Sequence, residues 1–519
     1  MRGESTSPLL GKIDRASREF HDHPAVITDD ACLTHADVAT LSRRVAASLR
    51  DRGVRKGDRV ALYAQNGAEF AVLYLGIVRA GAVVVPLNLL IHTPEILHVL
   101  KDAGVTGILT QESLRERLQD ALPLLPVPPF VIALRETASP IENLTELLLS
   151  EEGESDLFFN PTEDLVAILY TSGTTGFPKG AMLTHANLAA NTQSVHEAMC
   201  WRSGLDRVLV VLPMFHAFAA TVGLLTPLTN GSALIPLHRF EPDAVSLAVE
   251  KHAATIFLGV PSMYSVLLRL PEARVTRFAS VRFAVSGGAA MPVSVMRAFE
   301  DKFNVKVYEG DGPTECSPVT CVNPIGGLQK SGTVGLPVPG VEMKIVASDG
   351  RECPVGEVGE IAVRGANVMK GYWGQPMATE EVIRDGWLYT GDLGTRDVDG
   401  YFSIVDRKKD LIIVNGMNVY PRMVEEVLYG IEGIREVAVI GEPDKLHGEV
   451  PVAYLALDEG ASLDEKGLRE RSRALLGRHQ VPKRFIILPA LPRNAAGKIL
   501  KRELRLDGER ERGIDLVRT

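Results

Sequence analysis

The sequence is poor in cysteine, and the positions of its few cysteines exclude two kinds of structure. Five occur in 519 residues, as Cys32, Cys200, Cys316, Cys321 and Cys353. Because their number is odd and none has the Cys-x-x-Cys spacing, they fit neither a disulfide framework nor a zinc site. We expect five reduced thiols in a cytoplasmic protein.

We also expect no secretory signal, and the sequence has no run of apolar residues long enough to cross a membrane. Its first residues, Met1–Thr6, have no apolar core. The most apolar early stretch, Phe70–Ile91, is interrupted by Arg79, Gly81 and Pro86. It therefore predicts a helix, a turn and a buried strand, and no transmembrane segment. Peripheral contact with a membrane stays open.

An excess of basic residues is absent too. The formal net charge is −9, which argues against non-specific binding of nucleic acid. There is no repeat with a period of about 20 to 50 residues. With 45% hydrophobic and 23% charged residues, the composition is that of a globular protein, and 519 residues are enough for two or three domains.

Strand and helix signals alternate along the first part of the chain. Apolar residues at helical spacing between 38 and 49 predict a helix, with Thr34 as its N-cap and Gly53 at its end. Further signals follow at 59–64 (strand), 69–80 (helix), 83–86, 207–212 and 254–258 (strands). This alternation predicts an α/β protein built from layered sheets.

The pattern changes in the last third of the chain. Between 333 and 405, short strand-like runs alternate with turns, which predicts a small β subdomain that closes the large domain. The charged run Asp406–Asp410 would ordinarily be a solvated turn. After it, a small α+β domain is predicted, with helices at 421–430 and 464–476 and strands at 437–440, 451–457 and 485–488. The predicted domains are 1–406 and 407–519.

The most informative segment is Tyr170-Thr-Ser-Gly-Thr-Thr-Gly-Phe-Pro-Lys-Gly180. After Tyr170 it holds four hydroxyl side chains, three glycines and Lys179. Glycines let backbone N–H groups turn toward a ligand, hydroxyls donate to phosphate oxygens, and lysine adds positive charge. The spacing differs from the Walker A pattern G-x-x-x-x-G-K-[ST]. The segment indicates a polyphosphate cradle, with a surface loop between core elements as the alternative.

Four other motifs occur in a recognisable order. They are Tyr308-Glu-Gly-Asp-Gly-Pro-Thr-Glu-Cys-Ser-Pro318, Gly386-Trp-Leu-Tyr-Thr-Gly-Asp392, Asp406-Arg-Lys-Lys409 and Pro492-Arg-Asn-Ala-Ala-Gly-Lys-Ile-Leu-Lys-Arg-Glu-Leu504. Together with the cradle they resemble the adenylate-forming superfamily of acyl-CoA synthetases, aryl-CoA ligases, beetle luciferases and peptide-synthetase adenylation domains. From about residue 20 to about 505, the chain looks most like the acid–CoA ligase branch.

The resemblance implies a two-step reaction. The carboxylate of an acid attacks the α-phosphorus of ATP, pyrophosphate leaves, and an acyl-adenylate forms; the thiol of coenzyme A then displaces AMP. Such a site binds three phosphates and Mg²⁺ and neutralises the negative charge that develops on the phosphate oxygens. We therefore expect ATP, Mg²⁺ and coenzyme A as cofactors or co-substrates.

The resemblance also assigns residues to the nucleotide. The cradle would be Thr171, Ser172, Gly173, Thr174, Thr175, Gly176 and Lys179, with Thr171 and Glu315 holding Mg²⁺. Thr314 would contact the α-phosphate, Gly288 and Ala289 the adenine, and Asp392 and Arg407 the ribose. Lys498 would bridge the α-phosphate and the acyl carboxylate. The expected catalytic residues are Lys498, Glu315, Lys179 and Thr314.

One position departs from the pattern of the family. Relatives carry at position 311 an aromatic ring that stacks on adenine, whereas this chain has Asp311, which cannot stack. Tyr308 lies three residues upstream.

The resemblance also implies motion. Lys409 falls at the family's hinge, about which the small domain rotates between the two half-reactions.

The acyl pocket is expected to be apolar. By resemblance it is formed by His216, Phe218, Val222, Val260, Gly287, Gly288 and Gly312, with Met263 nearby. His216 stands where amino-acid-activating relatives have an aspartate, which argues against an amino acid. Gly312 stands where acetate-specific relatives have a tryptophan, so a larger acid is expected. The motifs favour an aliphatic acid, and an aromatic one stays open.

Several functions remain open on this basis. The favoured one is a ligase for medium- or long-chain fatty acids, with an aryl or cyclic acid as the alternative. A stand-alone enzyme that loads an acyl carrier protein is a second reading, and a degenerate nucleotide-binding sensor is the non-enzymatic one. A luciferase is compatible with the fold, although no motif supports oxygen chemistry. A monomer or homodimer is expected.

Overall fold

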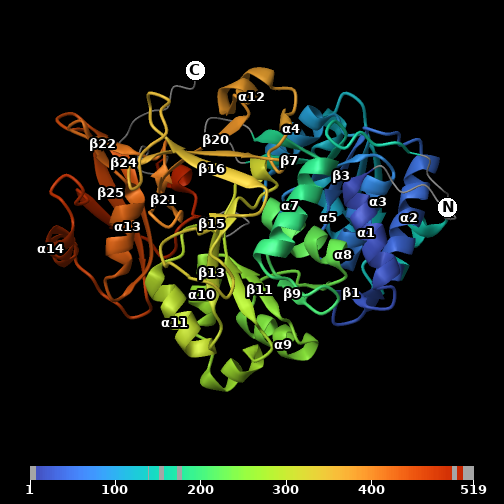
Figure 1. Ribbon diagram of the computed structural model, residues 1–519, viewed down its shortest axis with the longest axis horizontal. Helices are drawn as coiled ribbons and strands as arrows, with labels where there is room; N and C mark the ends of the chain where they lie inside the picture. Colours follow the sequence, from blue (N-terminus) through green and yellow to red (C-terminus); the bar gives the residue numbers. More distant parts are fainter. Residues whose placement is uncertain (1–6, 138, 151–156, 172–177, 494–498, 506–519) are drawn as a thin grey trace. The chain divides into compact units, whose positions relative to one another are not determined.

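The computed structural model describes residues 7–137, 139–150, 157–171, 178–493 and 499–505. The chain divides into two compact units. The first consists of residues 1–291, 295–343 and 363–388, and the second of residues 292–294, 344–362 and 389–519. The elements of both units are labelled in Figure 1.

The first unit contains a seven-stranded sheet in the order β18-β8-β7-β4-β3-β5-β6. Strands β3 to β7 run parallel, and β8 and β18 continue the sheet in antiparallel pairs. The strands are β3 (Arg59–Tyr63), β4 (Val83–Pro86), β5 (Gly107–Gln111), β6 (Phe130–Leu134), β7 (Leu165–Thr171), β8 (Lys179–Thr184) and β18 (Gly371–Tyr372). Strand β4 is buried along its whole length, as expected of a parallel strand covered on both faces.

A nine-stranded sheet follows the order β15-β14-β13-β12-β11-β9-β10-β1-β2. Its middle strands are parallel, whereas β2, β14 and β15 pair antiparallel at the two edges. The strands are β1 (Pro24–Ile27), β2 (Cys32–Thr34), β9 (Arg207–Val210), β10 (Ala233–Pro236), β11 (Ile256–Gly259), β12 (Phe283–Ser286), β13 (Val307–Asp311), β14 (Cys321–Val322) and β15 (Leu336–Pro337). In Figure 1 the region of β13, β11 and β9 runs from yellow to green.

Helices connect these strands. They are α1 (Pro8–Glu19), α2 (His35–Asp51), α3 (Ala68–Arg79), α4 (Thr93–Ala103), α5 (Glu112–Arg115), α6 (Pro140–Asn143), α7 (His185–Ala198), α8 (Thr226–Asn230), α9 (Pro242–His252), α10 (Pro261–Leu267), α11 (Val293–Phe303) and α12 (Pro376–Val382). Helix α2 confirms the predicted N-cap, because Thr34 and Asp37 form a capping box. Short 3₁₀ turns are η1 (Glu116–Leu118), η2 (Leu122–Leu124), η3 (Thr145–Leu148), η5 (Glu272–Phe278) and η6 (Thr314–Cys316), and η4 (Ala219–Leu225) is a π-helix.

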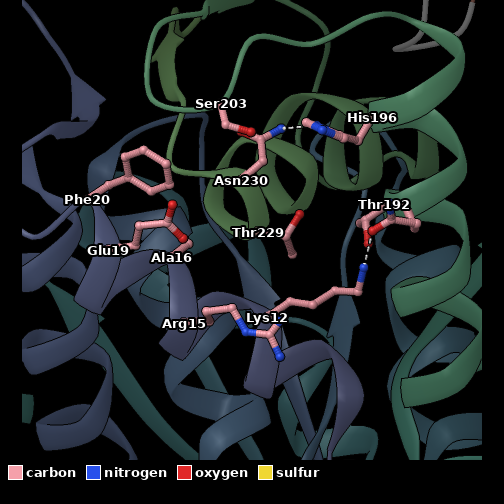
Figure 2. A pocket seen from close by; sticks show the side chains of 11 residues that line it. Lys12, Arg15, Ala16, Glu19, Phe20, Thr192, His196, Ser203, Thr229 and Asn230 are labelled. Carbon is pink, nitrogen blue, oxygen red and sulfur yellow. Dashed lines mark hydrogen bonds between the residues drawn. The ribbon is translucent and has the colours of Figure 1, made fainter.

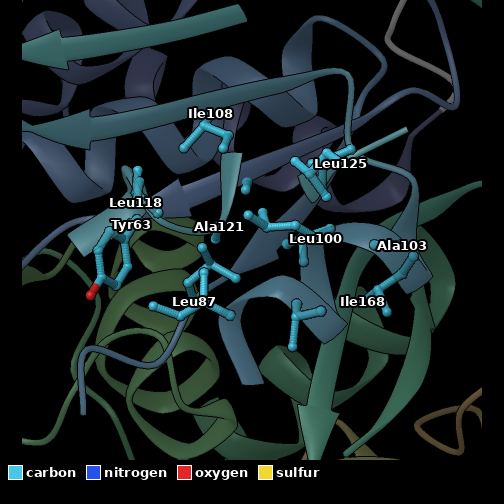
Figure 3. Packing of buried hydrophobic residues seen from close by; sticks show 14 of the residues in the cluster. Tyr63, Leu87, Leu100, Ala103, Ile108, Leu118, Ala121, Leu125 and Ile168 are labelled. Atoms are coloured by element: carbon cyan, nitrogen blue, oxygen red, sulfur yellow. The ribbon is translucent and has the colours of Figure 1, made fainter. Parts of the chain in front are cut away.

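Apolar side chains fill the space beside the seven-stranded sheet. Figure 3 shows Tyr63 of β3, Ile108 of β5 and Ile168 of β7 packed with Leu100 of α4 and Leu118 of η1. All five are buried. Burial of this kind supplies the main driving force for folding, so the sheet that carries the predicted phosphate loop is a rigid support.

The second unit holds most of a third sheet and all of a fourth. The third has the order β16-β17-β20-β19 with β21 beside β20, and the fourth the order β23-β22-β25-β24 with β26 beside β25. The strands are β16 (Val341–Val346), β17 (Gly359–Gly365), β19 (Ile383–Arg384), β20 (Trp387–Arg396), β21 (Phe402–Arg407), β22 (Ile412–Val414), β23 (Met417–Val419), β24 (Ile434–Asp444), β25 (Gly448–Leu457) and β26 (Arg484–Ile487). Helices α13 (Pro421–Tyr429) and α14 (Glu465–Leu475) pack on the fourth sheet through Val424, Leu428 and Leu468.

The sequence predictions agree with this architecture at the level of layers and elements. The predicted helices and strands of the C-terminal region are α13, β24, β25, α14 and β26. Residues 344–362 and 389–406 belong to the second compact unit, together with the residues after 406. The predicted domain boundary between residues 406 and 407 therefore stays a prediction. All five cysteines are free thiols. Within the described ranges, no helix is long and apolar enough to span a membrane.

Candidate active site

The predicted acyl and adenine residues follow four neighbouring parallel strands. In the order β13-β12-β11-β9, the register pairs Glu309 with Ser286, Gly259 with Ser286 and Leu258 with Val210. The carboxyl ends of the four strands therefore meet at one edge of the sheet. In open parallel sheets ligands bind at this edge.

The turn after β12 brings four predicted substrate residues together. A Cβ atom on Gly287 would lie 3.1 Å from the ring of Phe218 and 3.6 Å from the carbonyl oxygen of Gly310. A Cβ atom on Gly288, where φ is +76°, would lie 3.7 Å from the side chain of Val260. Gly287 is buried, whereas Gly288 and Ala289 are exposed. The turn thus has one face against the apolar side chains and another open to a ligand.

The segment after β9 is held by a buried asparagine. Asn66 donates from Nδ2 to the carbonyl oxygens of Leu212 (2.9 Å) and Leu237 (3.0 Å) and accepts from the N–H of Met214 (2.7 Å). Further along, His216 is exposed and Phe218 is half-buried. The asparagine therefore fixes the start of the predicted acyl segment.

The acyl segment continues into the π-helix η4. Val222, on this helix, is fully buried, and Val260 and Met263 are nearly so. Val260 is the N-cap of α10, and its carbonyl oxygen accepts from the N–H of Met263 (2.9 Å). π-Helical turns occur often at functional sites, because the inserted residue shifts which side chains face a ligand.

Gly312 has a backbone reason for its identity. A Cβ atom there would lie 1.7 Å from the carbonyl oxygen of Pro318, so no larger residue fits this backbone. The glycine is therefore required by the fold and does not by itself report the size of the acyl pocket. Asp311, at the end of β13, is partly buried, and its carbonyl oxygen accepts from Thr320 through the N–H and the hydroxyl, both at 3.0 Å.

Tyr308 is a core residue. Its ring packs edge-on against Phe283, and its hydroxyl accepts from the N–H of Gly326 (3.0 Å). Only 7% of the residue is exposed. Tyr308 therefore does not replace the aromatic ring that relatives carry three residues later.

The two ends of the predicted phosphate loop face each other across a strand pair. Thr171 ends β7, Lys179 begins β8, and the register pairs these two residues. The Thr171 hydroxyl donates to the carbonyl oxygen of Lys179 at 3.4 Å. The remaining cradle residues, Ser172, Gly173, Thr174, Thr175 and Gly176, lie outside the described residues, as does Lys498.

Glu315 sits in the short turn η6, beside Thr314, and residues distant in the sequence hold it. The hydroxyl of Tyr372 donates to Glu315 Oε1 (2.7 Å), and the N–H of Met369 donates to the Glu315 carbonyl oxygen (2.7 Å). Buried Asn367 donates to the carbonyl oxygen of Cys316 (2.9 Å). Burial first, and then the Glu315 carboxylate, raise the pKa of Tyr372, so the phenol stays a donor.

The second unit holds the two predicted ribose residues side by side. Asp392 of β20 and Arg407 of β21 are paired in the register, and Arg407 Nε lies 3.1 Å from Asp392 Oδ1. Asp392 is buried, whereas 42% of the arginine side chain is exposed. The ion pair orients a carboxylate and a guanidinium beside each other, at the place predicted to hold the ribose.

The predicted hinge lies in a cluster of charges within the second unit. Burial first, and then the nearby guanidinium of Arg407, lower the pKa of Lys409. Its neighbour Asp410 forms an ion pair with Arg505 (2.8 Å). Lys501 forms an ion pair with Glu425 of α13 (2.7 Å). These ion pairs fasten the residues after 498 to the hinge segment and to α13.

A polar pocket of about 170 Å³ lies elsewhere in the first unit. Figure 2 shows that it lies between α1, α7 and α8. Lys12 contacts Gln193, and Asn230 donates to Nδ1 of His196 (3.1 Å). Among the described residues, it is lined by none of the predicted site residues. We therefore assign it no part in the reaction.

Sequence reasoning did not find Tyr372, Asn66 or the π-helix η4. Tyr372 stands between a glycine and a tryptophan, a pattern that indicates no chemistry, and its partner Glu315 is 57 residues away in the sequence. Asn66 precedes a glycine, which indicates only a turn. No local signal in these segments reports their tertiary contacts.

Comparison with known proteins gives the same assignment as the motifs. Residues 13–373 match the family model described as AMP-binding enzyme, and residues 423–498 match the AMP-binding enzyme C-terminal domain. The long-chain-fatty-acid–CoA ligase of Bacillus subtilis (strain 168) is 37% identical over 95% of this chain and 92% of its own. The feruloyl-CoA synthase of an Amycolatopsis species is 38% identical over 95% of this chain and 97% of its own.

A solved structure matches the architecture as well. ATP-bound MatB from Rhodopseudomonas palustris superposes with a TM-score of 0.88 at 33% identity, over 95% of this chain and 98% of that one. This chain therefore belongs to the AMP-binding, adenylate-forming family of enzymes. Within it, the chain is an AMP-forming acid–CoA ligase.

Proposed function

We propose that this ligase activates a medium- or long-chain fatty acid with ATP and Mg²⁺ and transfers the acyl group to coenzyme A. The carboxylate attacks the α-phosphorus of ATP, giving the acyl-adenylate and pyrophosphate. The pantetheine thiol then attacks the acyl carbonyl carbon, and AMP leaves. We further propose that the enzyme acts in the cytosol, as a monomer or homodimer.

The observation that carries the proposal is the apolar turn beside the carboxyl end of β13. Gly287 packs on Phe218, and Gly288 lies against Val260. A Cβ atom built on Gly287 would also lie 3.6 Å from the carbonyl oxygen of Gly310. Gly310 directly precedes the Asp311–Glu315 motif, so the turn and this motif are close together. An apolar acyl chain could therefore lie against the turn while its carboxylate reaches the motif that handles phosphate. The similarity to a long-chain-fatty-acid–CoA ligase supports the same substrate class.

The described residues fit a magnesium site. Mg²⁺ prefers oxygen ligands and binds through one or two carboxylates plus phosphates. Tyr372 engages one carboxylate oxygen of Glu315, and within the described part of the chain the other oxygen makes no hydrogen bond. The Thr171 hydroxyl is the second predicted ligand. When bound, the metal would neutralise phosphate charge, while Lys179 and Thr314 orient the phosphates.

The remaining roles follow from the motifs. Asp392 and Arg407 would hold the ribose, Gly288, Ala289 and Asp311 the adenine, and Lys498 would stabilise the charge that develops at the α-phosphate. His216 and Gly312 would border the acyl chain together with Val222. Lys409 would be the hinge of the C-terminal domain, with the boundary near residue 407.

An aryl acid is the second candidate, because a feruloyl-CoA synthase is as similar to this chain as the fatty acid ligase. The apolar turn suits an aromatic ring as well as an alkyl chain. The two classes differ in the length of pocket that they need.

The test is a coupled measurement of AMP and acyl-CoA formation with ATP, Mg²⁺, coenzyme A and a panel of acids from acetate to palmitate, with benzoate and ferulate. We expect a thioester product and the highest kcat/KM for an aliphatic acid of medium or long chain. A higher kcat/KM for ferulate or benzoate would assign the aryl class. Pyrophosphate release without a thioester would replace coenzyme A by a carrier protein as the acceptor.

A further inference from the structure

Strand β18 is an edge strand that lies directly beside the start of β8. Its register pairs Tyr372 with Ala181, and the N–H of Trp373 donates to the carbonyl oxygen of Gly180 (2.8 Å). Since Lys179 begins β8, the backbone places Tyr372 next to the lysine end of the phosphate loop. Both residues lie in the first unit.

The same short segment also grips the Glu315 turn. Met369 donates its N–H to the main chain of Glu315, and Tyr372 donates its hydroxyl to the side chain, both at 2.7 Å. Hydrogen bonds to an ionised group are shorter and stronger than neutral ones. Two contacts from one segment therefore fix both the position and the rotamer of Glu315.

The ring of Tyr372 has a second partner. The ammonium of Lys179 lies 5.2 Å from the ring centroid, within the range of a cation–π contact. No ion pair joins Lys179 to Glu315 among the residues that the structure describes. One tyrosine thus contacts a cation through its ring and an anion through its hydroxyl.

We propose that Tyr372 is a positioning residue that orients Glu315 for Mg²⁺ and Lys179 for the phosphates of ATP while keeping the two charges from pairing with each other. This inference rests on the proposed function, since it takes Glu315 as a metal ligand and Lys179 as a phosphate ligand. A direct Lys179–Glu315 ion pair would have to be broken before the metal and the nucleotide could bind. The tyrosine contacts both groups, Lys179 through its ring and Glu315 through its hydroxyl.

The test uses three variants of the full-length protein and a readout that needs no turnover. Tyr372→Phe removes only the hydroxyl, and Tyr372→Leu removes the ring as well. Tyr170→Phe is the matched control, because Tyr170 donates to Asp102 (2.6 Å) from the same sheet but touches neither Glu315 nor Lys179 among the described contacts. Affinity for ATP is measured by calorimetry across a Mg²⁺ titration and in EDTA, without acid or coenzyme A.

The two changes at Tyr372 should separate the two contacts. We expect Tyr372→Phe to raise the Mg²⁺ concentration for half-maximal ATP binding by about tenfold, the effect of one charge-assisted hydrogen bond. ATP affinity in EDTA should stay at the wild-type value. Tyr372→Leu should show the same shift and should also weaken ATP binding in EDTA by about threefold, through the lost cation–π contact. Tyr170→Phe should keep the wild-type Mg²⁺ requirement.

The outcomes distinguish failure of the inference from failure of the proposed function. A wild-type Mg²⁺ requirement in Tyr372→Phe would overturn the inference alone, provided that the wild-type protein binds MgATP. Equal weakening with Mg²⁺ and in EDTA would mean a merely structural role and would overturn it too. If the wild-type protein bound no ATP at all, the proposed function would fail and the inference with it. Should Tyr372→Leu not fold, the Tyr372→Phe result alone decides.

Discussion

Asp311 ends β13, at the position where the family resemblance leads us to expect an aromatic ring stacked on adenine. Tyr308 cannot take the place of this ring, because its own ring packs against Phe283 and its hydroxyl accepts from the N–H of Gly326. A carboxylate can accept a hydrogen bond from the adenine amino group, but it cannot supply the stacking contact. The adenine is therefore expected to be held less tightly than in relatives that have the ring.

We predict that Asp311→Tyr lowers the KM for ATP by about tenfold, since stacking of a base on an aromatic side chain contributes about 1–3 kcal/mol. Asp311→Asn is the control, because it removes the charge without adding a ring, and it should leave the KM near the wild-type value. Steady-state kinetics at saturating acid and coenzyme A would measure both. If Asp311→Asn lowered the KM for ATP and Asp311→Tyr did not, the negative charge of Asp311, and not the absent ring, would be the cause of weak ATP binding.

Buried histidines make the stability of the fold depend on pH. His185, at the start of α7, is 1% exposed, and burial lowers its pKa from 6.5 to about 4, with Asp164 partly opposing the shift. Above pH 6.5 the residue is neutral in both the folded and the unfolded chain. As the pH falls below 6.5, the unfolded chain takes up a proton first, so stability is lost down to about pH 4.

We predict that this histidine accounts for about 3 kcal/mol of the loss in unfolding free energy between pH 7 and pH 4. His185→Gln, which cannot titrate, should show a correspondingly weaker dependence on pH over that range. His35, whose pKa burial also lowers to about 4, should keep its own contribution in the variant. Urea unfolding at a series of pH values would measure the difference, and an unchanged slope in the glutamine variant would contradict the assignment.

At the scale of elements, two buried asparagines anchor the two sides of the candidate site. Asn66 holds the segment after β9 through Leu212 and Met214. Asn191 of α7 holds the turn after Glu315, by donating to the carbonyl oxygen of Val319 (2.8 Å) and accepting from its N–H (3.2 Å). Each asparagine satisfies backbone groups that no solvent reaches.

We predict that Asn66→Ala and Asn191→Ala each lower the unfolding free energy by about 3 kcal/mol, because buried backbone groups lose their partners. Their kinetic effects should differ. Asn66→Ala should raise the KM for the acid more than that for ATP, whereas Asn191→Ala should raise the KM for ATP more. Each variant is the control of the other. If the two variants changed the KM for the acid and the KM for ATP in the same way, the asparagines would act on the fold as a whole.

The elements also show what a sequence can and cannot predict. Helix α2 and its cap follow from local spacing, and so do strands such as β3, β4 and β25, because apolar periodicity and capping are local properties. The π-helix η4 has no periodic signal of its own, and β18 has only two residues. The motifs predicted Glu315 and Lys179 singly. Their common contact with Tyr372 required the pairing of strands far apart in the sequence.

At the scale of the whole molecule, the predicted ATP residues are divided between the two compact units. Lys179 and Glu315 belong to the first, and Asp392, Arg407 and Lys409 to the second. If the small domain rotates between the half-reactions, the backbone around Lys409 must change conformation. In the described chain the N–H of Lys408 donates to Gly391 and that of Asp410 to Arg407, whereas the N–H of Lys409 makes no hydrogen bond.

Lys409 is therefore the residue of this segment where a proline removes no backbone hydrogen bond. Proline fixes φ near −65°, so Lys409→Pro should restrict rotation. We predict that this variant retains most of the adenylate-forming activity, measured by exchange of labelled pyrophosphate into ATP, and loses at least about tenfold in thioester formation. Lys409→Ala is the control, because it removes the amine and keeps the backbone free. It should leave the ratio of the two rates near that of the wild-type enzyme. Equal losses in both half-reactions of Lys409→Pro, or the same change of ratio in Lys409→Ala, would place the hinge elsewhere.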